Sequence, residues 1–344
     1  MDPKQCTEWK IIDVPIEIVR HLQQRNRKHF GQAHGTPFTI PPLSDQLGFS
    51  GDGEAANEIL TGTYDAATLN ESVQLLISHL KYIHGAERDP CRPTISDAEF
   101  SGKLRVVWRE STSTSPSGLH LGHYKALVAR HSFSTTADDC DLTPEFIERR
   151  NEINTKQAAI HVRLSLINYA LERGYSYRRW QNIVNSVLFK DPDNVRLHRT
   201  RIIHIYEADF NLAMGLKWRV ATQQAEDLKA LNDGQYGSRT GRSAIEPVYI
   251  EELQCKISRA TRKPLILTSY DATACYDRIV PNLGMVASQK YGVPATVTKS
   301  TAETLRLAKY MVRTELGISD IGYQHTDDLP IYGTGQGSTF SGQT

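Results

Sequence analysis

The chain has 344 residues, which is enough for two domains or for one large domain with an extension. Its charge is nearly balanced, with 40 Lys and Arg against 39 Asp and Glu, so no overall field marks a nucleic-acid partner. The five cysteines are widely spaced without a CxxC pair, and no apolar run reaches the ~18 residues that span a bilayer, so we expect an intracellular protein with reduced thiols and no membrane partner.

Residues 1–100 are predicted to form a mainly helical N-terminal extension without catalytic groups. A short helix is expected over residues 14–30, VPIEIVRHLQQRNRKHF. Residues 31–63 are rich in Gly, Pro, Ser, Thr and Asp, which is typical of an extended or flexible connection. Residues 69–84 are again predicted to be helical, with four apolar residues on one face: Val73, Leu76, Ile77 and Leu80.

The stretch around residue 120 favours a turn that enters a helix. A strand is expected at Val106–Trp108, followed by a Ser- and Thr-rich turn and the helical pattern GLHLGHYKALVAR of residues 118–130. His120 and His123 lie three residues apart, which is compatible with a metal pair on one face of a helix. The segment PSGLHLGHY also resembles the nucleotide-binding signature of class I aminoacyl-tRNA synthetases, and this resemblance implies that the two histidines contact ATP.

A cationic hairpin is predicted in the middle of the chain. A long amphipathic helix should end at Gly174, after which a strand leads to Lys190. Residues 191–194 favour a turn, and a second strand over residues 200–206 would carry Arg201 near its start. Arg offers a planar fork and Lys a point charge, so the hairpin suits a triphosphate, although solvated strand ends would have the same pattern.

The same region has a local excess of positive charge. Between Arg173 and Arg219, nine Lys and Arg stand against four Asp and Glu, a local net charge of +5 that favours a phosphate-facing patch. Helices are predicted over residues 211–228 and from about Val248. The glycine-rich stretch between them, DGQYGSRTGRSAIEPV, suits close approach of the backbone to a ligand or a nucleic-acid strand, or forms a plain loop.

The stretch LILTSYDATACYDRIVPNL, residues 265–283, is predicted to deliver a carboxylate from a buried strand. Leu265–Leu267 is a continuous apolar run, as expected of a strand covered on both faces, and Asp271 follows at its end. A second acid, Asp277, comes six residues later, and Pro281 suits the first turn of a further helix.

Aspartate at the end of a strand suits magnesium, which takes one or two carboxylates and fills its other octahedral positions with water and substrate phosphates. Two such ions hold the attacking and leaving oxygens of an in-line phosphoryl transfer, and they need acids from more than one strand. The structural alternative is that Asp271 caps the following turn and Asp277 pairs with neighbouring Arg278.

The C-terminal part offers a second glycine-rich block. Residues 297–316 are predicted to form one helix, and the HTDD segment at His325–Asp328 is expected to be a surface loop. Three glycines then follow in IYGTGQGSTFSG: Gly333, Gly335 and Gly337. They do not have the spacing of the GxGxxG dinucleotide fingerprint, because the third glycine comes one residue early.

Taken in order, five blocks resemble a reverse transcriptase of the retroelements that lack long terminal repeats. They are a tryptophan-led strand ending in Lys190, RII at Arg201–Ile203, then QYGSRTGRS, YDATACYD and GTGQGS. The resemblance implies an α+β right-hand polymerase fragment with three parts: the helical extension (1–100), a fingers-like region (101–222) and a partial ferredoxin-like palm (223–344). It also implies an RNA template, a DNA primer and dNTPs as partners, with Mg²⁺ as cofactor.

The same likeness assigns roles to single residues. Asp271 would bind both magnesium ions and catalyse nucleotidyl transfer. Tyr276 would be the steric gate under the sugar of the incoming nucleotide, which favours deoxynucleotides. Four residues would bind nucleotide and template: Lys190 and Arg201 from the fingers, and Gln336 and Gly337 from the glycine block.

The chain also departs from the family pattern. Gly335 stands where the family usually has proline, and Ser238 stands where an aromatic residue is common. The second catalytic block of the family, an aromatic residue followed by a pair of aspartates, should come after the glycine block, and the sequence stops at Thr344. We therefore expect this chain by itself to be unable to polymerise. The alternative is a non-catalytic RNA-binding remnant whose binding depends on salt.

Overall fold

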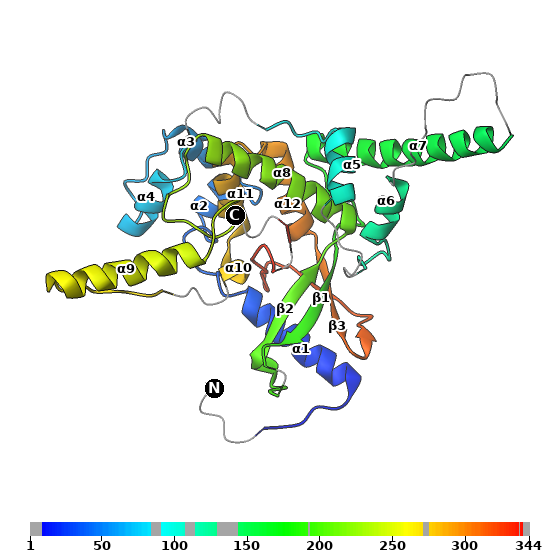
Figure 1. Cartoon of the computed structure of the whole chain (residues 1–344). Helices are drawn as coiled ribbons and strands as arrows, with labels where there is room; N and C mark the ends of the chain where they lie inside the picture. The colour runs from blue at the N-terminus through cyan, green and yellow to red at the C-terminus, as the bar shows by residue number, and fades with distance from the viewer. Residues whose placement is uncertain are drawn as a thin grey trace.

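The computed structural model describes residues 9–83, 91–106, 114–128, 144–191, 193–270, 275–336 and 338–339. The chain is an α+β protein in which helices pack around one small mixed sheet (Figure 1). The helices are α1 (Pro15–Phe30), α2 (Leu43–Leu47), α3 (Glu54–Thr61), α4 (Glu71–Ser78), α5 (Asp97–Val106), α6 (Leu121–Leu127), α7 (Pro144–Arg173), α8 (Ala208–Asp227), α9 (Ile245–Thr261), α10 (Cys275–Arg278), α11 (Pro281–Lys290) and α12 (Ala295–Arg306). The strands are β1 (Asn182–Phe189), β2 (Thr200–Ile205), β3 (Lys309–Thr314), β4 (Gly317–Ile318) and β5 (Tyr323–Gln324).

The sheet places the predicted hairpin at one edge. The strand order is β2-β1-β3-β4, and β5 also pairs with β3. β1 and β2 run antiparallel with Leu188 opposite Arg201, whereas β1 and β3 run parallel with Asn182 opposite Lys309. The hairpin that the strand and turn pattern predicts is therefore confirmed, and its first strand begins earlier than expected, at Asn182.

Residues 297–316 do not form one helix, so that prediction was wrong. α12 ends at Arg306, and the chain continues into β3, which pairs with both β1 and β5. Tyr310 and Val312 are buried while Lys309 is exposed, so burial alternates with the period of a strand. The helical expectation failed because the pairing of β3 with β1 joins segments more than a hundred residues apart in the sequence.

The main hydrophobic core lies between the sheet and the helices that cover it. Its largest buried side chains include Trp180, Trp218, Phe100 and Phe210. The predicted amphipathic helix is α7, and Gly174 ends it in the left-handed conformation, with φ +66°. The apolar positions of α7 that the core buries are Ile160, Leu164, Ile167 and Leu171.

Residues 31–63 are not an extended or flexible connection, contrary to the prediction. They contain α2 and α3, whose apolar residues form a second buried cluster with α4 and α11. Leu47 and Ile59 are buried there against Val286, and the Gln289 side chain donates to the carbonyl of Gly51 at 2.7 Å. The composition misled because Gly and Pro here separate short helices that gain their stability from tertiary packing. The N-terminal segment thus shares a core with the helix that follows α10.

The apolar run Leu265–Leu267 is not a buried strand. The structure assigns no strand there, and the side chains of Leu265, Ile266 and Leu267 are 42%, 88% and 50% exposed. The preceding helix α9 has no buried residue and projects from the body of the molecule (Figure 1). An apolar run becomes a strand only when another strand pairs with it, and no strand of the described residues does so.

Two other predicted elements differ from those in the structure. Val106 ends α5 instead of beginning a strand, and residues 107–108 of the predicted Val106–Trp108 strand lie outside the described ranges. The helix predicted over residues 69–84 is shorter, α4, and Leu76 on its expected apolar face is 38% exposed. Among the described residues, no helix combines the length and apolar character needed to cross a bilayer.

Candidate functional site

The residues Gly333–Gln336, here called the glycine segment, connect three parts of the chain that are distant in sequence. The backbone N–H of Thr334 donates to the carbonyl of Tyr276 at 3.0 Å, and that of Gly333 donates to Ile279 at 2.8 Å. On the other side, the N–H of His204 in β2 donates to the carbonyl of Gln336 at 2.7 Å. The glycine segment therefore binds both the turn that follows Asp271 in sequence and the strand that carries Arg201.

Two glycines make this close approach possible. Gly333 and Gly335 have φ of +94° and +75°, in the left-handed region that side chains rarely adopt. A Cβ atom on Gly333 would lie 2.8 Å from the carbonyl oxygen of Tyr276. A Cβ atom on Gly335 would overlap the imidazole ring of His204. Any other residue at either position would push the glycine segment away from α10 or from β2.

Tyr276 and Asp277 lie on the four-residue helix α10, beside the glycine segment. Tyr276 is 37% exposed, so its ring is available to a ligand. The Asp277 carboxylate is mostly buried and accepts a hydrogen bond from Nε2 of His29 in α1 at 2.7 Å. The partner of Asp277 is thus a residue 248 positions away, and not neighbouring Arg278 as the structural alternative supposed.

The cations of the hairpin gather at its exposed end. Lys190 and Arg201 are both exposed, and the N–H of Lys190 donates to the carbonyl of Arg199 at 2.9 Å. Arg201 stands opposite Leu188, two residues before Lys190. Lys190 directly follows β1 and Arg199 directly precedes β2, so Lys190, Arg199 and Arg201 all lie at this end of the hairpin.

Two predicted site residues, Asp271 and Gly337, lie outside the described residues. Of the other four, Gln336 is half-buried and bound through its carbonyl to β2, the strand that carries Arg201. Tyr276 is bound through its carbonyl to the same glycine segment, and Lys190 lies across the hairpin from Arg199. These four residues thus belong to one connected set of backbone contacts.

Part of the expected positive patch is used inside the protein. Nζ of Lys217 donates to the carbonyl of Arg92 at 2.9 Å and also to that of Thr94, and burial lowers the pKa of this lysine. Arg179 forms ion pairs with Glu207 and Asp209. Neither cation is therefore directed at a phosphate ligand.

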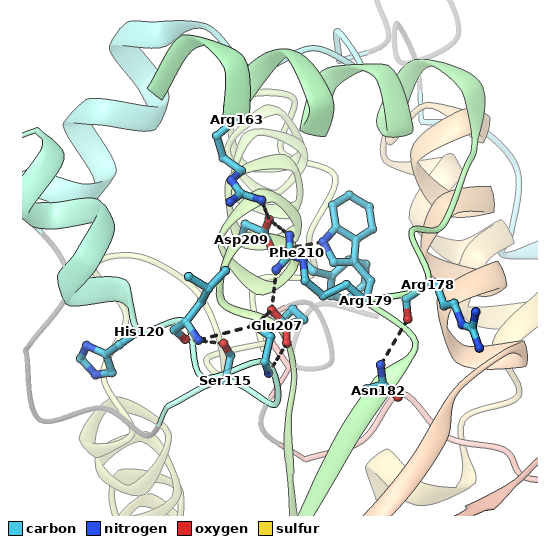
Figure 2. Close-up of polar contacts among 12 residues, drawn as sticks. Ser115, His120, Arg163, Arg178, Arg179, Asn182, Glu207, Asp209 and Phe210 are labelled. Atoms are coloured by element: carbon cyan, nitrogen blue, oxygen red, sulfur yellow. Dashed lines mark hydrogen bonds and ion pairs between the residues drawn. The ribbon is translucent and has the colours of Figure 1, made fainter. Parts of the chain in front are cut away.

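Arg179 belongs to a buried ionic network at the base of the hairpin (Figure 2). The side chains of Glu207 and Asp209 are 0% and 1% exposed, and the guanidinium of Arg179 bridges them. The backbone N–H and hydroxyl of Ser117 donate to Glu207 at 2.7 and 2.8 Å, and the indole N–H of Trp180 donates to Asp209 at 3.1 Å. The network ties the turn before α6 to the junction of β2 and α8.

Sequence patterns did not identify this network. In the sequence, Glu207 and Asp209 are two acids within a basic region. Their neighbours in the sequence do not show whether such a carboxylate is buried or solvated. Burial lowers the pKa of the Arg179 guanidinium, but its hydrogen bonds and charge contacts with Asp209 and Glu207 outweigh that effect and raise the pKa.

The two histidines at the start of α6 have a local structural function. Nδ1 of His120 accepts a hydrogen bond from the N–H of Gly122 at 2.9 Å. Nδ1 of His123 accepts one from the N–H of His120 at 3.2 Å. This reciprocal cap accounts for their spacing without a metal ion or ATP.

Magnesium ligands are only partly represented in the described residues. Within those ranges, no group of three or more His, Cys, Asp or Glu side chains is arranged to hold a metal ion. Oδ1 of Asp277 is a buried carboxylate oxygen without a hydrogen-bond partner in the described structure. One such oxygen is too few for a divalent ion, so the fit of magnesium depends on Asp271.

A groove of about 690 Å³ lies along the outer side of α1. Cations dominate its charged residues, with Arg20, Arg27 and Lys28 against Asp328. The guanidinium of Arg27 lies 5.7 Å from the ring centroid of Tyr323, and its Nε is buried without a hydrogen-bond partner in the described structure. Asp328 of the HTDD segment lines the groove together with Leu329 and Pro330, and the segment is the surface loop that the sequence predicts.

The buried ring of His204 predicts a loss of stability in acid. Burial lowers its pKa from 6.5 to about 4, although the nearby charge of Asp277 acts in the opposite direction. Because the folded-state pKa lies below the unfolded value, the unfolded chain binds the proton first as the pH falls. The contribution of the neutral His204 ring to the free energy of unfolding is therefore complete above pH 6.5. It is lost as the pH falls from 6.5 to about 4.

We expect the free energy of unfolding to fall by about 3 kcal/mol over that pH interval through His204 alone. Urea unfolding at a series of pH values measures the slope. The variant His204→Phe keeps a ring at this position but has no proton to bind, so its slope should be smaller. Equal slopes for the two proteins would contradict the assignment.

Comparison with known proteins returned no match, either to a model of a protein family or to a curated protein sequence.

Proposed function

We propose that the chain belongs to a reverse transcriptase and that the surface formed by the hairpin, α10 and the glycine segment binds a template, a primer end and an incoming deoxynucleotide. The observation that carries the proposal is the double attachment of the glycine segment, to Tyr276 on one side and to β2 on the other. The glycine block is thereby bound to the YDATACYD block and to His204, the residue that follows the RII block. In this proposal the hairpin belongs to the fingers, and α10, α11 and the glycine segment belong to a partial palm.

The proposed reaction is attack of a primer 3′-hydroxyl on the α-phosphate of a dNTP. The new bond from the 3′-oxygen to the α-phosphorus replaces the bond to the β-phosphate, so pyrophosphate leaves and the hydroxyl proton passes to water. Lys190 and Arg201 would neutralise the triphosphate from the exposed end of the hairpin, where the backbone N–H of Lys190 is bound to the carbonyl of Arg199. The Tyr276 ring would lie under the sugar, and Gln336 and Gly337 would support the new base pair. The contribution of these residues is to orient the two reactants and to balance charge.

Magnesium enters the proposal through Asp271. When bound there, the ion would neutralise the charge of the phosphates during the displacement. The residues of this chain would hold the nucleotide in place, exclude water from its base and select its sugar.

A second candidate function is RNA binding without catalysis. The groove beside α1 favours it, because its charged residues are mainly cations and a polyanion gains affinity from each phosphate that is neutralised. A fragment with this groove and the exposed hairpin cations would bind RNA even if no nucleotide could be added.

The two functions are distinguished by measuring Mg²⁺-dependent dNTP binding to the protein on an RNA template with a DNA primer. We expect Asp271→Asn to abolish that dependence. Arg201→Ala should weaken dNTP binding about tenfold, which corresponds to about 1.4 kcal/mol, because a charged hydrogen-bonding partner of the triphosphate is lost. Lys256→Ala, which removes an exposed cation from α9, is the matched control and should have no effect.

Two results would contradict the proposal, and a third would overturn the expectation that the chain alone is inactive. RNA binding that depends on salt and survives Asp271→Asn, with no dNTP binding by the wild type, would favour the binding module. ATP–pyrophosphate exchange that is lost in His120→Ala would favour the synthetase alternative. Template-dependent primer extension by the wild type would refute the expectation that the chain alone cannot polymerise.

A further inference from the structure

Asp277 is the acid of the YDATACYD block to which the proposed function assigns no role. It directly follows Tyr276 in α10, and its side chain is 16% exposed. Its Oδ2 accepts a hydrogen bond from Nε2 of His29 at 2.7 Å, and its Oδ1 is buried without a partner in the described structure. One side chain from α1 therefore holds this carboxylate in place.

The charge of Asp277 is also felt by groups on two other elements. It acts to raise the pKa of Arg25 on α1, of His204 on β2 and of Tyr206, which directly follows β2. Burial has the larger effect in each case: it lowers the pKa of Arg25 and His204 and raises that of Tyr206. Asp277 is thus the negative centre of a cluster formed by α1, β2 and α10. His29, also on α1, makes a direct hydrogen bond with Asp277.

α1 is fixed independently of the hydrogen bond between His29 and Asp277. Phe30 is fully buried, with its ring centroid 5.2 Å from that of His204. The Arg25 guanidinium donates to the carbonyl of Thr200 at 2.9 Å, and the N–H of Tyr332 donates to the carbonyl of Phe30 at 3.0 Å. His29 is therefore a donor in a fixed position, and removing its side chain leaves the attachment of α1 intact.

The helix that carries Tyr276 is short. α10 has four residues, so its own backbone hydrogen bonds constrain it weakly. The glycine segment holds the carbonyl of Tyr276 on one side, and the His29–Asp277 hydrogen bond holds the next residue on the other. A ring that excludes a 2′-hydroxyl must be placed within a fraction of an ångström, so this tether affects selectivity more than overall binding.

We propose that His29 is a positioning residue for sugar selection: through Asp277 it fixes α10 and hence the Tyr276 ring that faces the nucleotide sugar. The inference rests on the proposed function, to which it adds a residue of the N-terminal helix. Without the His29 donor, Asp277 turns toward solvent, α10 loosens, and the ring no longer excludes ribonucleotides.

The test compares binding of dNTP and rNTP to the wild type and three variants on the same template and primer. His29→Ala should reduce the preference for dNTP at least tenfold, whereas His29→Gln, which keeps an N–H donor, should stay within about twofold of the wild type. His21→Ala is the matched control on α1 and should leave the preference unchanged. A loss of folding would lower the affinities for dNTP and rNTP together. Displacement of the Tyr276 ring instead changes the ratio of the two affinities.

A second readout needs no nucleotide. Cys275 is exposed and precedes Tyr276, so the rate at which a maleimide alkylates it, followed by peptide mass spectrometry, reports how tightly α10 is held. We expect a faster rate in His29→Ala and a wild-type rate in His29→Gln. An unchanged rate in His29→Ala would overturn the positioning role, whatever the nucleotide data show.

Two further outcomes separate the role of His29 from the proposed function. A faster Cys275 rate with an unchanged dNTP-to-rNTP ratio would refute the link from His29 to sugar selection. A wild type that binds neither nucleotide would refute the proposed function, and sugar selection with it, while the Cys275 rates would still report the tether.

Discussion

Replacing Arg179 with alanine should lower the free energy of unfolding by about 3 kcal/mol, among the largest effects of any single substitution in this chain. Arg179 is the cation that bridges the buried carboxylates of Glu207 and Asp209. Arg163 approaches Asp209 only to 3.9 Å and cannot replace both contacts. The variant would leave buried negative charge without its counter-ion, which costs much more than the loss of a surface ion pair. Urea unfolding at pH 7 measures the difference.

The neighbouring arginine is a matched control. Arg178 is exposed, and its backbone carbonyl makes the contact with Asn182, so Arg178→Ala should change stability by less than about 0.5 kcal/mol. Arg179→Lys should fall between the two, because an ammonium group keeps the charge but cannot span two carboxylates as a guanidinium does. If Arg179→Ala and Arg178→Ala unfolded at the same urea concentration, the network would have no role in stability.

Gly335→Ala should be nearly as destabilising and should also separate the glycine segment from β2. Its φ of +75° costs an alanine about 1 kcal/mol, and the added methyl group would overlap the buried His204 ring, which costs about 2 kcal/mol more. Because the His204–Gln336 hydrogen bond would be broken, we expect dNTP binding on a template and primer to be lost as well. Unfolding and nucleotide titration on the same preparation measure both effects.

Gly35 separates backbone strain from steric overlap. It has φ +83°, and an added Cβ would meet no atom of the described chain within 4 Å outside its immediate neighbours. Gly35→Ala should therefore cost about 1 kcal/mol and leave nucleotide binding unchanged. If Gly335→Ala cost no more than Gly35→Ala, the close approach of the glycine segment to His204 would not matter for folding.

The proposed site depends on contacts from other parts of the chain, here called its supports. The proposed nucleotide-binding residues lie on a hairpin end, a four-residue helix and a glycine segment, and none of these is stable by itself. Each is held by a contact from elsewhere: the hairpin base by the Arg179 network, α10 by His29, and the glycine segment by backbone bonds to both sides. Disturbing a support should therefore change how the site binds nucleotide or how it selects the sugar, although the support itself contacts no ligand.

The amino-acid sequence by itself determined the elements whose signals are local. Pro15 begins α1, the apolar positions of α7 recur with helical spacing up to Gly174, and the turn after Lys190 returns the chain into β2. In each case neighbouring residues carry the whole pattern, because the period of a helix and the conformation of a turn are set within a few positions. The overall α+β class, which the resemblance implied, is also that of the structure.

Tertiary structure alone decided the features that join distant residues. The run Leu265–Leu267 has the composition of a buried strand, but a strand needs a partner, and composition does not supply one. The hydrogen bond between His29 and Asp277 spans 248 positions, and no local pattern distinguishes it from a bond between Asp277 and Arg278. The burial of Glu207 is of the same kind, because a carboxylate is buried or solvated according to which loops and helices pack over it. Such contacts arise from the path of the chain as a whole, and that path is fixed only when the separate elements pack together.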